Sequence, residues 1–221
     1  MQRIVLTVIL VAAVAGPAGL ARAQVLEVPR STEPAFWGSL GAGLYEVHDV
    51  EDGRTQSVWR FGDGLQFRAT GDITIRNGTT IGALVGYARL PLVYSGAATG
   101  AGSCAGCDAH ADVWSAMLLF HLGGNDGFHQ VIDVAAGVTR YANFEADASG
   151  EQLTPEGDTD LALSIGYGFG YALTPRFAVE LVQDFAITLH QDEGLRGDAG
   201  RVGQQRTTRL GVRYGLGTRG N

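Results

Sequence analysis

The sequence predicts an all-β protein, an eight-stranded antiparallel transmembrane β-barrel with up-and-down topology. Three observations lead to this fold class. Segments that alternate apolar and polar residues recur along the chain, the joints between them are alternately long and short, and the array follows an N-terminal export signal. A sheet that closes on itself in a membrane, with every turn on one side kept short, produces this order.

Residues 1–23 have the features of a cleavable signal peptide. Arg3 supplies the positive charge, residues 4–15 form the apolar stretch, and Ala21-Arg22-Ala23 is a small-residue cleavage site. The apolar run is too short to cross about 30 Å of hydrocarbon as a helix. We therefore expect export into the periplasm and a mature chain that starts at Gln24.

Composition fits the same interpretation. The 33 glycines in 221 residues are about twice the usual share, as expected where side chains crowd a narrow barrel interior. Removal of residues 1–23 takes away Arg3 and Arg22, which leaves 14 basic against 23 acidic residues and a net charge of −9. Such an acidic chain is not expected to bind nucleic acid.

Eight segments are long enough to cross a membrane as strands, which takes about 9–11 residues each. They are expected at 36–47, 57–69, 79–93, 110–122, 128–143, 159–173, 176–190 and 204–217. The barrel then occupies residues 36–217, between a periplasmic linker at 24–35 and a tail at 218–221.

The sixth and seventh segments alternate most regularly. In residues 159–173 the large apolar side chains share one face, and the other face is mostly Gly, Ala and Ser. The second segment is irregular, because Asp63 falls on the apolar parity between Gly62 and Gly64, which predicts a bulge or a shifted boundary.

The joints alternate in length. The short ones are expected at 70–78, which ends in an Asn77-Gly78 turn, at 123–127 and at 174–175. The long ones are expected at 48–56, 94–109, 144–158 and 191–203, outside the cell. Aromatic residues near strand ends are expected to form two interfacial girdles: Trp37, Trp59, Tyr94, Trp114, Tyr141, Tyr171 and Tyr214.

A signal peptide, eight amphipathic strands, three short turns and four longer loops resemble the OmpA/OmpX-type small outer-membrane barrels. The segment Arg209 to Leu216 also resembles the C-terminal insertion signal of barrel proteins, with Gly211, Tyr214 and Leu216 at the expected spacing. Such proteins commonly end in an aromatic residue, whereas this chain continues to Asn221. The resemblance implies an outer-membrane location, and outer-membrane lipids, lipopolysaccharide and the barrel-insertion machinery as partners.

Cys104 and Cys107 form a CxxC motif in the second long joint. Haem attachment would need a His after the second Cys, where Asp108 stands, and a zinc site would need further ligands beyond nearby His110 and Asp112. In an oxidising compartment we expect a Cys104–Cys107 disulfide.

Two groups of residues are candidates for chemistry. His121 and His129 have the same inward parity, and Ser115 and Asp133 lie on the same two strands, so a hydrolytic site is conceivable. The His-x-Ser pair of outer-membrane lipid A deacylases is absent, however. Around the third long joint the acidic residues Glu145, Asp147, Glu151, Glu156, Asp158 and Asp160 gather without a basic neighbour, a composition that can hold Ca²⁺ but has no EF-hand spacing. We expect structural histidines, solvated carboxylates and no metal or cofactor.

The most specific expectation concerns the lumen. Glu180 and Asp184 on the seventh segment have inward parity, as do Arg209 and Arg213 on the eighth. If the hairpin folds symmetrically, residues whose numbers sum to 393 face each other, which pairs 184 with 209 and 180 with 213. A two-residue slip would leave the charges as diagonal neighbours.

The sequence therefore predicts a non-enzymatic outer-membrane barrel that is filled by its own side chains. Its role would be envelope structure or surface interaction through the extracellular loops. A lipid-modifying hydrolase and a narrow gated pore are the alternatives.

Overall fold

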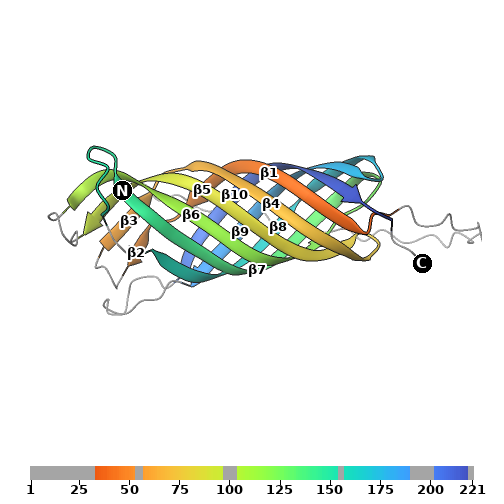
Figure 1. Ribbon diagram of the computed structural model, residues 1–221, viewed down its shortest axis with the longest axis horizontal. Helices are drawn as coiled ribbons and strands as arrows, with labels where there is room; N and C mark the ends of the chain where they lie inside the picture. Colours follow the sequence, from red (N-terminus) through yellow and green to blue (C-terminus); the bar gives the residue numbers. More distant parts are fainter. Residues whose placement is uncertain (1–32, 53–56, 97–103, 154–156, 190–201, 219–221) are drawn as a thin grey trace, which may run out of the picture. The chain divides into compact units, whose positions relative to one another are not determined.

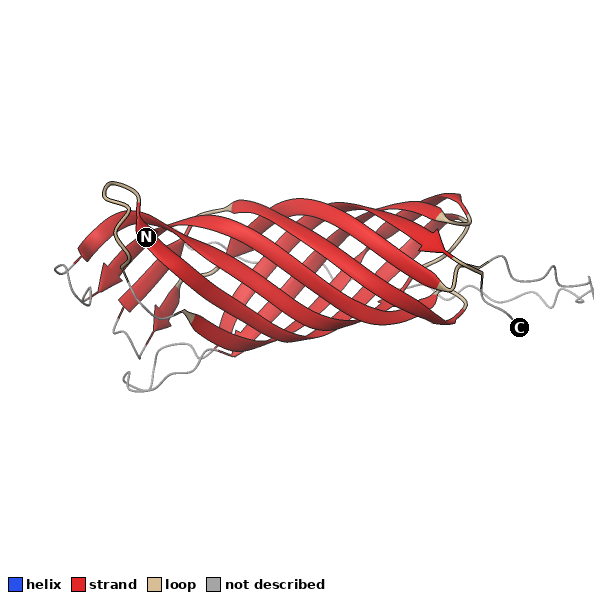
Figure 2. Ribbon diagram, viewed as in Figure 1, coloured by secondary structure: helices blue, strands red, loops and turns tan. Residues whose placement is uncertain are grey.

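A computed structural model gives the fold and describes residues 33–52, 57–96, 104–153, 157–189 and 202–218. The chain divides into two compact units, 1–30 and 31–221. The first unit, with the predicted signal peptide, lies outside the described residues, so residues 1–23 stay a prediction. Strands make up the second unit (Figure 2), and none of the described segments is a helix long and apolar enough to span a membrane.

The described strands wind around one closed barrel (Figure 1). Their bounds are β1 (Phe36–Val47), β2 (Val50–Asp52), β3 (Ser57–Phe61), β4 (Gly64–Arg76), β5 (Thr79–Gly96), β6 (Cys104–Leu122), β7 (Gly127–Ala146), β8 (Asp158–Thr174), β9 (Phe177–Leu189) and β10 (Val202–Leu216).

Eight of these strands form the ring, in the order β5-β4-β1-β10-β9-β8-β7-β6, and the β5–β6 pairing closes it. All pairings are antiparallel, and the first and last strands meet with Phe36 opposite Leu216. The eight-stranded antiparallel transmembrane barrel predicted from the sequence is confirmed. Closure leaves no free edge in the ring, so the backbone groups of the wall bond to one another.

The second segment is interrupted where Asp63 breaks the alternation. β3 and β4 both pair with β5, one after the other, and Gly62 donates its amide to the Pro91 carbonyl at the break, 2.8 Å away. β3 thereby lies beyond the ring and carries β2 on its far side.

The prediction of a joint at 70–78 is wrong, because β4 continues to Arg76 and the turn consists of Asn77 and Gly78 alone. Residues 73 and 75 are isoleucines that keep the alternation, so no loop is needed there. Gly78 has φ of 67°, the left-handed conformation that an Asn-Gly hairpin turn requires. A Cβ at Gly78 would also lie 2.5 Å from the Gly123 carbonyl oxygen.

The loops on the opposite side are shorter than expected, because the strands extend into them. β5 continues to Gly96 and β6 begins at Cys104, so the joint expected at 94–109 is mostly strand. β7 likewise continues to Ala146, and Glu145 forms a bridge with Gln152. The joint 48–56 contains β2, and most of 191–203 lies outside the described residues. We call this side the loop end. The side with the short turns after β4, β6 and β8 is the turn end.

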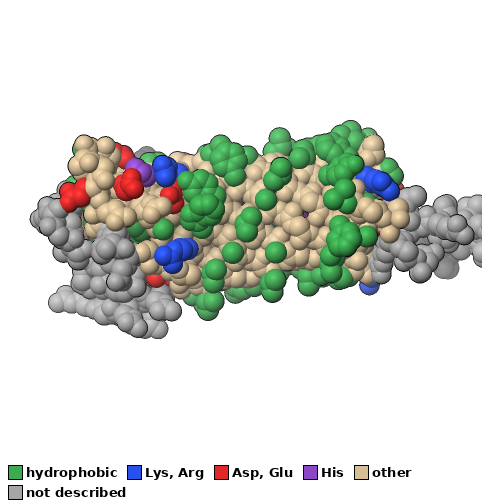
Figure 3. Space-filling model, viewed as in Figure 1, with side chains coloured by type: hydrophobic (Ala, Val, Ile, Leu, Met, Phe, Trp, Pro, Cys, Tyr) green, Lys and Arg blue, Asp and Glu red, His purple; other side chains and the backbone are tan. Residues whose placement is uncertain are grey.

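The outer wall carries a band of exposed apolar side chains (Figure 3). On β8 this face is the one predicted from the sequence: Leu161, Leu163, Ile165, Tyr167, Phe169, Tyr171 and Leu173. We call the band the apolar belt; it runs from Phe36, Phe128 and Leu216 at the turn end to Leu44, Val85 and Trp114 toward the loop end. A closed barrel that exposes its apolar side chains and buries its charged ones has the distribution that a lipid environment favours.

The predicted aromatic girdles are partly wrong. Trp114, Tyr171 and Tyr214 face outward, but Trp37, Trp59, Tyr94 and Tyr141 are buried inside the barrel or its loop-end extension. A position near a strand end does not decide whether a side chain faces the inside or the outside of the barrel. The alternation of residues along the strand decides it.

Candidate functional site

The lumen inside the apolar belt is filled by charged side chains. Glu180 and Asp184 of β9 and Arg209 and Arg213 of β10 all point inward and are 5–6% exposed. They do so because alternation places the even residues of β9 and the odd residues of β10 on the inner face. The apolar residues between them, such as Leu181 and Leu210, face the membrane side.

The hairpin register differs from the one expected. Asp184 lies opposite Thr207 and Arg209 opposite Val182, so facing residues sum to 391 and not to 393. β9 ends at Leu189 opposite Val202, which moves the centre of the hairpin by one residue. The charges are therefore diagonal neighbours: Arg209 Nε donates to Asp184 Oδ2 at 2.6 Å, and Arg213 Nη1 lies 3.9 Å from Glu180 Oε1.

Side chains from three further strands complete the central cluster. Arg68 of β4 contacts Asp184 at 3.2 Å and Asp133 of β7 at 3.4 Å, and Asp133 also pairs with Arg209. His121 of β6 lies between two carboxylates, with Nδ1 2.7 Å from Asp133 and Nε2 3.7 Å from Glu180. These six residues span β4, β6, β7, β9 and β10, and so cross-link opposite sides of the barrel.

A second set of contacts lies nearer the turn end. Arg213 Nη2 donates to Asp72 Oδ2 at 2.9 Å and to Thr80 Oγ1 at 2.8 Å, and its guanidinium stands 5.0 Å from the centroid of the Trp37 ring. The sequence pattern did not predict this position of Asp72, because a turn was expected at 70–78. The inward parity of Asp72 on a longer second strand was the available signal.

The linker residues next to β1 also contact the barrel. Glu33 is buried and accepts hydrogen bonds from the Gly78 amide at 3.0 Å and from Asn125 Nδ2 at 2.7 Å. It thus joins the turn between β4 and β5 to the loop between β6 and β7. An extended linker was expected at 24–35, but its last residues pack against the turn end.

The luminal charges that contact one another nearly balance. Three arginines (Arg68, Arg209 and Arg213) face four carboxylates (Asp72, Asp133, Glu180 and Asp184), with His121 held between two of the four. Buried charges are tolerated only when they are paired and hydrogen-bonded. We call these eight residues the luminal network. Its chemistry is that of a stabilising plug, since each charged group already has a partner.

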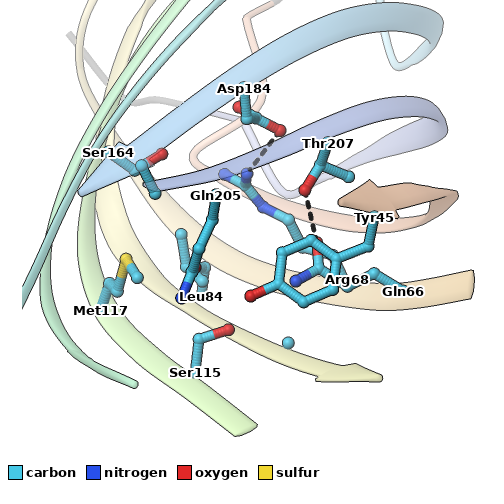
Figure 4. A pocket seen from close by; sticks show the side chains of 12 residues that line it. Tyr45, Gln66, Arg68, Leu84, Ser115, Met117, Ser164, Asp184, Gln205 and Thr207 are labelled. Carbon is cyan, nitrogen blue, oxygen red and sulfur yellow. Dashed lines mark hydrogen bonds and ion pairs between the residues drawn. The ribbon is translucent and has the colours of Figure 1, made fainter. Parts of the chain in front are cut away.

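A small cavity lies beside the network on its loop-end side (Figure 4). Its volume is about 30 Å³, and its polar lining includes Arg68, Ser115, Asp184, Gln205 and Thr207. Arg68 Nε and Asp184 Oδ1 have no hydrogen-bond partner among the described residues. A cavity of this size and polarity accommodates about one buried water, which is too little space for an organic ligand.

The conceivable hydrolytic site is not assembled. His121 does contact Asp133, but Ser115 stands six residues from His121 along β6, about 20 Å at the strand rise of roughly 3.4 Å per residue. His129 contacts the Gly127 carbonyl at 3.1 Å near the turn end. Ser115 is therefore too far from the His121–Asp133 pair to act as its nucleophile, as covalent catalysis would need.

Beyond the belt, the inside of the barrel becomes apolar. Trp59 of β3 packs on Phe144 and Tyr141, with ring centroids 4.6 and 5.8 Å apart, and Tyr45 and Leu90 are buried in the same cluster. Asn143, with φ of 53°, lies at a bulge in β7 that shifts the inward parity from Tyr141 to Phe144. We call this the aromatic cluster, and it fills the barrel at the loop end.

The acidic residues expected around the third long joint lie in different environments. Glu145 and Asp147 contact His110, at 3.4 and 2.8 Å, whereas Asp160 is buried inside the barrel. Glu156 lies outside the described residues. Within the part of the chain that is described, no group of His, Cys, Asp or Glu is arranged to hold a metal ion.

The CxxC motif lies on β6 and not in a loop. Cys107 pairs with Tyr94 and Cys104 with Gly96, and the ladder shifts at Gly106, which has φ of 78°. This bulge adds one residue to β6, so positions 104 and 107 regain the same strand parity. The Cys104–Cys107 disulfide stays a prediction, because the Cys104 side chain is outside the described part.

The residues of the expected insertion signal lie on β10. Tyr214 and Leu216 face outward within the apolar belt, and Gly211 lies opposite Gly41 of β1. Their recognition by the insertion machinery stays a prediction.

No protein-family model and no curated protein matches the sequence. Among solved structures, Neisserial surface protein A is similar, with a TM-score of 0.51 and 14% identity over 82% of this chain and 97% of that one. The N-terminal barrel domain of Pseudomonas aeruginosa OprF (TM-score 0.43, 14% identity, 82% and 97% covered) and the Yersinia pestis attachment invasion locus protein Ail (0.40, 15%, 82% and 98%) also match.

At such low sequence identity these similarities concern the fold alone. Of the three, only the similarity to Neisserial surface protein A has a TM-score above 0.5, and only this one supports a comparison of folds. A barrel of this kind, with an apolar outer belt, supports a bacterial outer-membrane location. The chain has the fold of the small eight-stranded outer-membrane β-barrels of the OmpA/OmpX type.

Proposed function

We propose that this protein is a non-enzymatic outer-membrane barrel whose envelope or surface-interaction role is carried by its loop end, which faces outside the cell. The observation that supports this best is the extension of the wall past the apolar belt. β5, β6 and β7 continue to Gly96, Cys104 and Ala146 and carry β2 and β3 with them. We call this extension the platform. Rigid strands present a surface more reproducibly than free loops do.

The filled lumen favours this role over a pore. A conducting barrel needs a continuous water path, whereas here the luminal network and the aromatic cluster follow each other along the interior. Eight strands leave an interior that side chains can fill.

The orientation has a direct test. Protease added to intact cells should cut within 147–157 or 190–201 and spare the turns at 77–78 and 175–176. Cleavage that requires permeabilised cells would place the loop end in the periplasm and reject the proposed role.

The role itself is tested with two charge-neutralised variants. One carries Glu145→Gln and Asp147→Asn on the platform, which removes two negative charges. The control carries Asp126→Asn and Arg176→Gln at the turn end, which removes one charge of each sign. The readouts are adhesion and aggregation of cells, together with their resistance to detergent. If the platform acts by surface interaction, its variant should reproduce the adhesion defect of a deletion strain while the control does not. If the role is to support the structure of the envelope, the deletion strain should lose resistance to detergent, whereas neither variant should.

Two assays on the purified protein test the alternative functions, a gated pore and a lipid-modifying hydrolase. In planar bilayers it should give no regular conductance steps, and it should release no fatty acid from lipid A. Conductance that appears after Arg209→Ala would favour the gated pore. Hydrolysis that is lost in His121→Ala would favour the lipid-modifying enzyme.

A further inference from the structure

The platform has a groove of about 490 Å³ beside the break at which β3 ends and β4 begins. Gly62, Pro91 and Val93 are among the residues that line it. Gly62 keeps the groove open, because a Cβ at this position would stand 3.2 Å from Pro91 Cγ. We call this the platform groove. Its volume is within the range of ligand sites, roughly 300–1,000 Å³.

The platform groove lies on the outer face of the sheet. Arg60 of β3 lies opposite Val93 of β5, and Val93 lies opposite Asp108 of β6. Residues directly opposite each other on neighbouring strands share one face. The Arg60 side chain is 69% exposed and Asp108 is exposed, whereas the adjacent Trp59 and Ala109 are buried on the inner face. A partner can therefore reach the groove from solvent.

Two carboxylates line the groove. Asp108 has no hydrogen-bond or ion-pair partner for its carboxylate among the described residues. Asp147 lines the same groove, and its amide donates to the Asp108 carbonyl at 3.0 Å, which fixes the two residues beside each other. His110 Nδ1 lies 2.8 Å from Asp147 Oδ1 and so occupies one oxygen of this carboxylate. Asp108 and the second oxygen of Asp147 are left for another donor.

The groove and its margin carry a negative charge. Arg60 also lines the groove, but its Nε lies 4.0 Å from Asp49 Oδ2, which partly balances it. Glu145 lies beside Asp147, 3.4 Å from the other ring nitrogen of His110. One arginine then stands against four carboxylates, a net charge of −3 with His110 counted as neutral: Asp49, Asp108, Glu145 and Asp147. Acidic side chains and a histidine gather toward the loop end on the face that Figure 3 shows.

We propose that the platform groove binds a basic peptide segment of a partner protein through an arginine side chain. The guanidinium binds between Asp108 and Asp147, since its planar fork donates bidentate hydrogen bonds to carboxylates. Its apolar stem packs on Pro91 and Val93, as long basic side chains do on apolar surface. Complementary charge favours such a partner over an acidic one. The inference rests on the proposed function and names the kind of partner that the loop end contacts.

The experiment measures fluorescence anisotropy of a short end-labelled peptide of alternating arginine and threonine, titrated with the purified barrel in a non-ionic detergent. One matched peptide has citrulline in place of arginine, which keeps the shape and removes the charge, and another has glutamate. The arginine peptide should bind about tenfold more tightly than the citrulline peptide, which is the contribution of a charge-assisted hydrogen bond. The glutamate peptide should not bind.

Two variants locate the site. Asp108→Asn should weaken binding of the arginine peptide about fivefold, the upper end of what an exposed ion pair contributes, and leave the citrulline peptide unaffected. Val93→Arg places a positive charge inside the groove and should weaken the arginine peptide more than Asp108→Asn does. Heat-modifiable migration in gels verifies that each variant is folded.

The matched control is Asp126→Asn, which removes one exposed aspartate at the turn end. The proposal is overturned if this control weakens the arginine peptide as much as Asp108→Asn does, if citrulline binds as tightly as arginine, or if the glutamate peptide binds more tightly. The measurement uses no cells. Absence of peptide binding together with an adhesion defect of the platform variant would therefore reject this inference alone, whereas the protease test rejects the proposed role whatever the peptide does.

Discussion

Inside the apolar belt the barrel encloses charge, whereas beyond the belt the same strands enclose an aromatic cluster. Arg209 and Asp184 are buried in the first region, and Trp59 and Phe144 in the second. The outer faces change in the opposite sense, from Ile165 and Leu210 within the belt to exposed Arg89 and Arg140 outside it.

The two regions differ because lipid surrounds the apolar belt and water surrounds the platform. Within the belt, apolar residues are best placed on the outside, and the narrow interior is filled by polar groups that pair with one another. On the platform, water surrounds the sheet and the apolar residues turn inward, as in an ordinary soluble β-protein. The two regions should therefore respond differently to substitutions.

The largest effect is expected in the luminal network. Arg209→Ala leaves Asp133 and Asp184 buried with less compensation, and loss of one partner from a buried pair costs about 3–5 kcal/mol. Urea unfolding of the barrel in lipid vesicles measures this loss, and Arg206→Ala, which faces outward on the same strand, is the control.

A double-mutant cycle then isolates the pair. Arg209→Ala combined with Asp184→Ala should lose less stability than the sum of the two single variants, because the second substitution removes a stranded charge. Strictly additive losses would mean that the two side chains do not interact.

A substitution in the aromatic cluster should destabilise the platform without destabilising the rest of the barrel. Trp59→Ala removes a core aromatic, a change that typically costs about 3–5 kcal/mol in a packed core, but here the loss should be confined to the platform. Amide hydrogen exchange should accelerate in β2 and β3 and stay unchanged in β8 and β9. Faster exchange throughout the barrel would show that the two regions unfold together.

The outer faces are compared with an introduced arginine. Ile165→Arg, in the belt, should cost about 2–4 kcal/mol, as expected for an arginine on the lipid face near the bilayer midplane. Val93→Arg, on the platform, should cost little, because its position is next to solvent. Equal costs at both positions would contradict an apolar belt that ends near Val85 and Trp114.

The smallest effect is expected from the cysteines. The loop that a Cys104–Cys107 disulfide would close is very short, and stabilisation by loop closure grows with loop length. Thiol titration of the non-reduced protein should find no free cysteine, and Cys107→Ser should lower stability by no more than about 2 kcal/mol. Two titratable thiols would refute the disulfide.

The later strands show how far the sequence was sufficient. The outward face of β8 was predicted residue by residue, because alternation is a local property that a window of about ten residues reveals. The second segment was harder: Asp63 signalled the break, but residues 70–76 were taken for a turn although Ile73 and Ile75 continue the strand.

The contacts in the lumen could be predicted from the sequence only in part. Parity indicated that Arg209 and Asp184 point inward, but a symmetric hairpin predicted the wrong register by two residues. The contacts of Arg68 with Asp184 and of Asp72 with Arg213 were not predicted, since these pairs are more than a hundred residues apart in the chain. Nothing in the local pattern encodes that proximity.

The sequence by itself determined the fold class, the number of ring strands and the faces of the most regular ones, because each depends on alternation and on turn residues close in the chain. Only the tertiary structure decided which charges meet in the lumen and that the strands extend into a platform. These features depend on strand register and on closure of the ring, which bring together residues from β1 to β10.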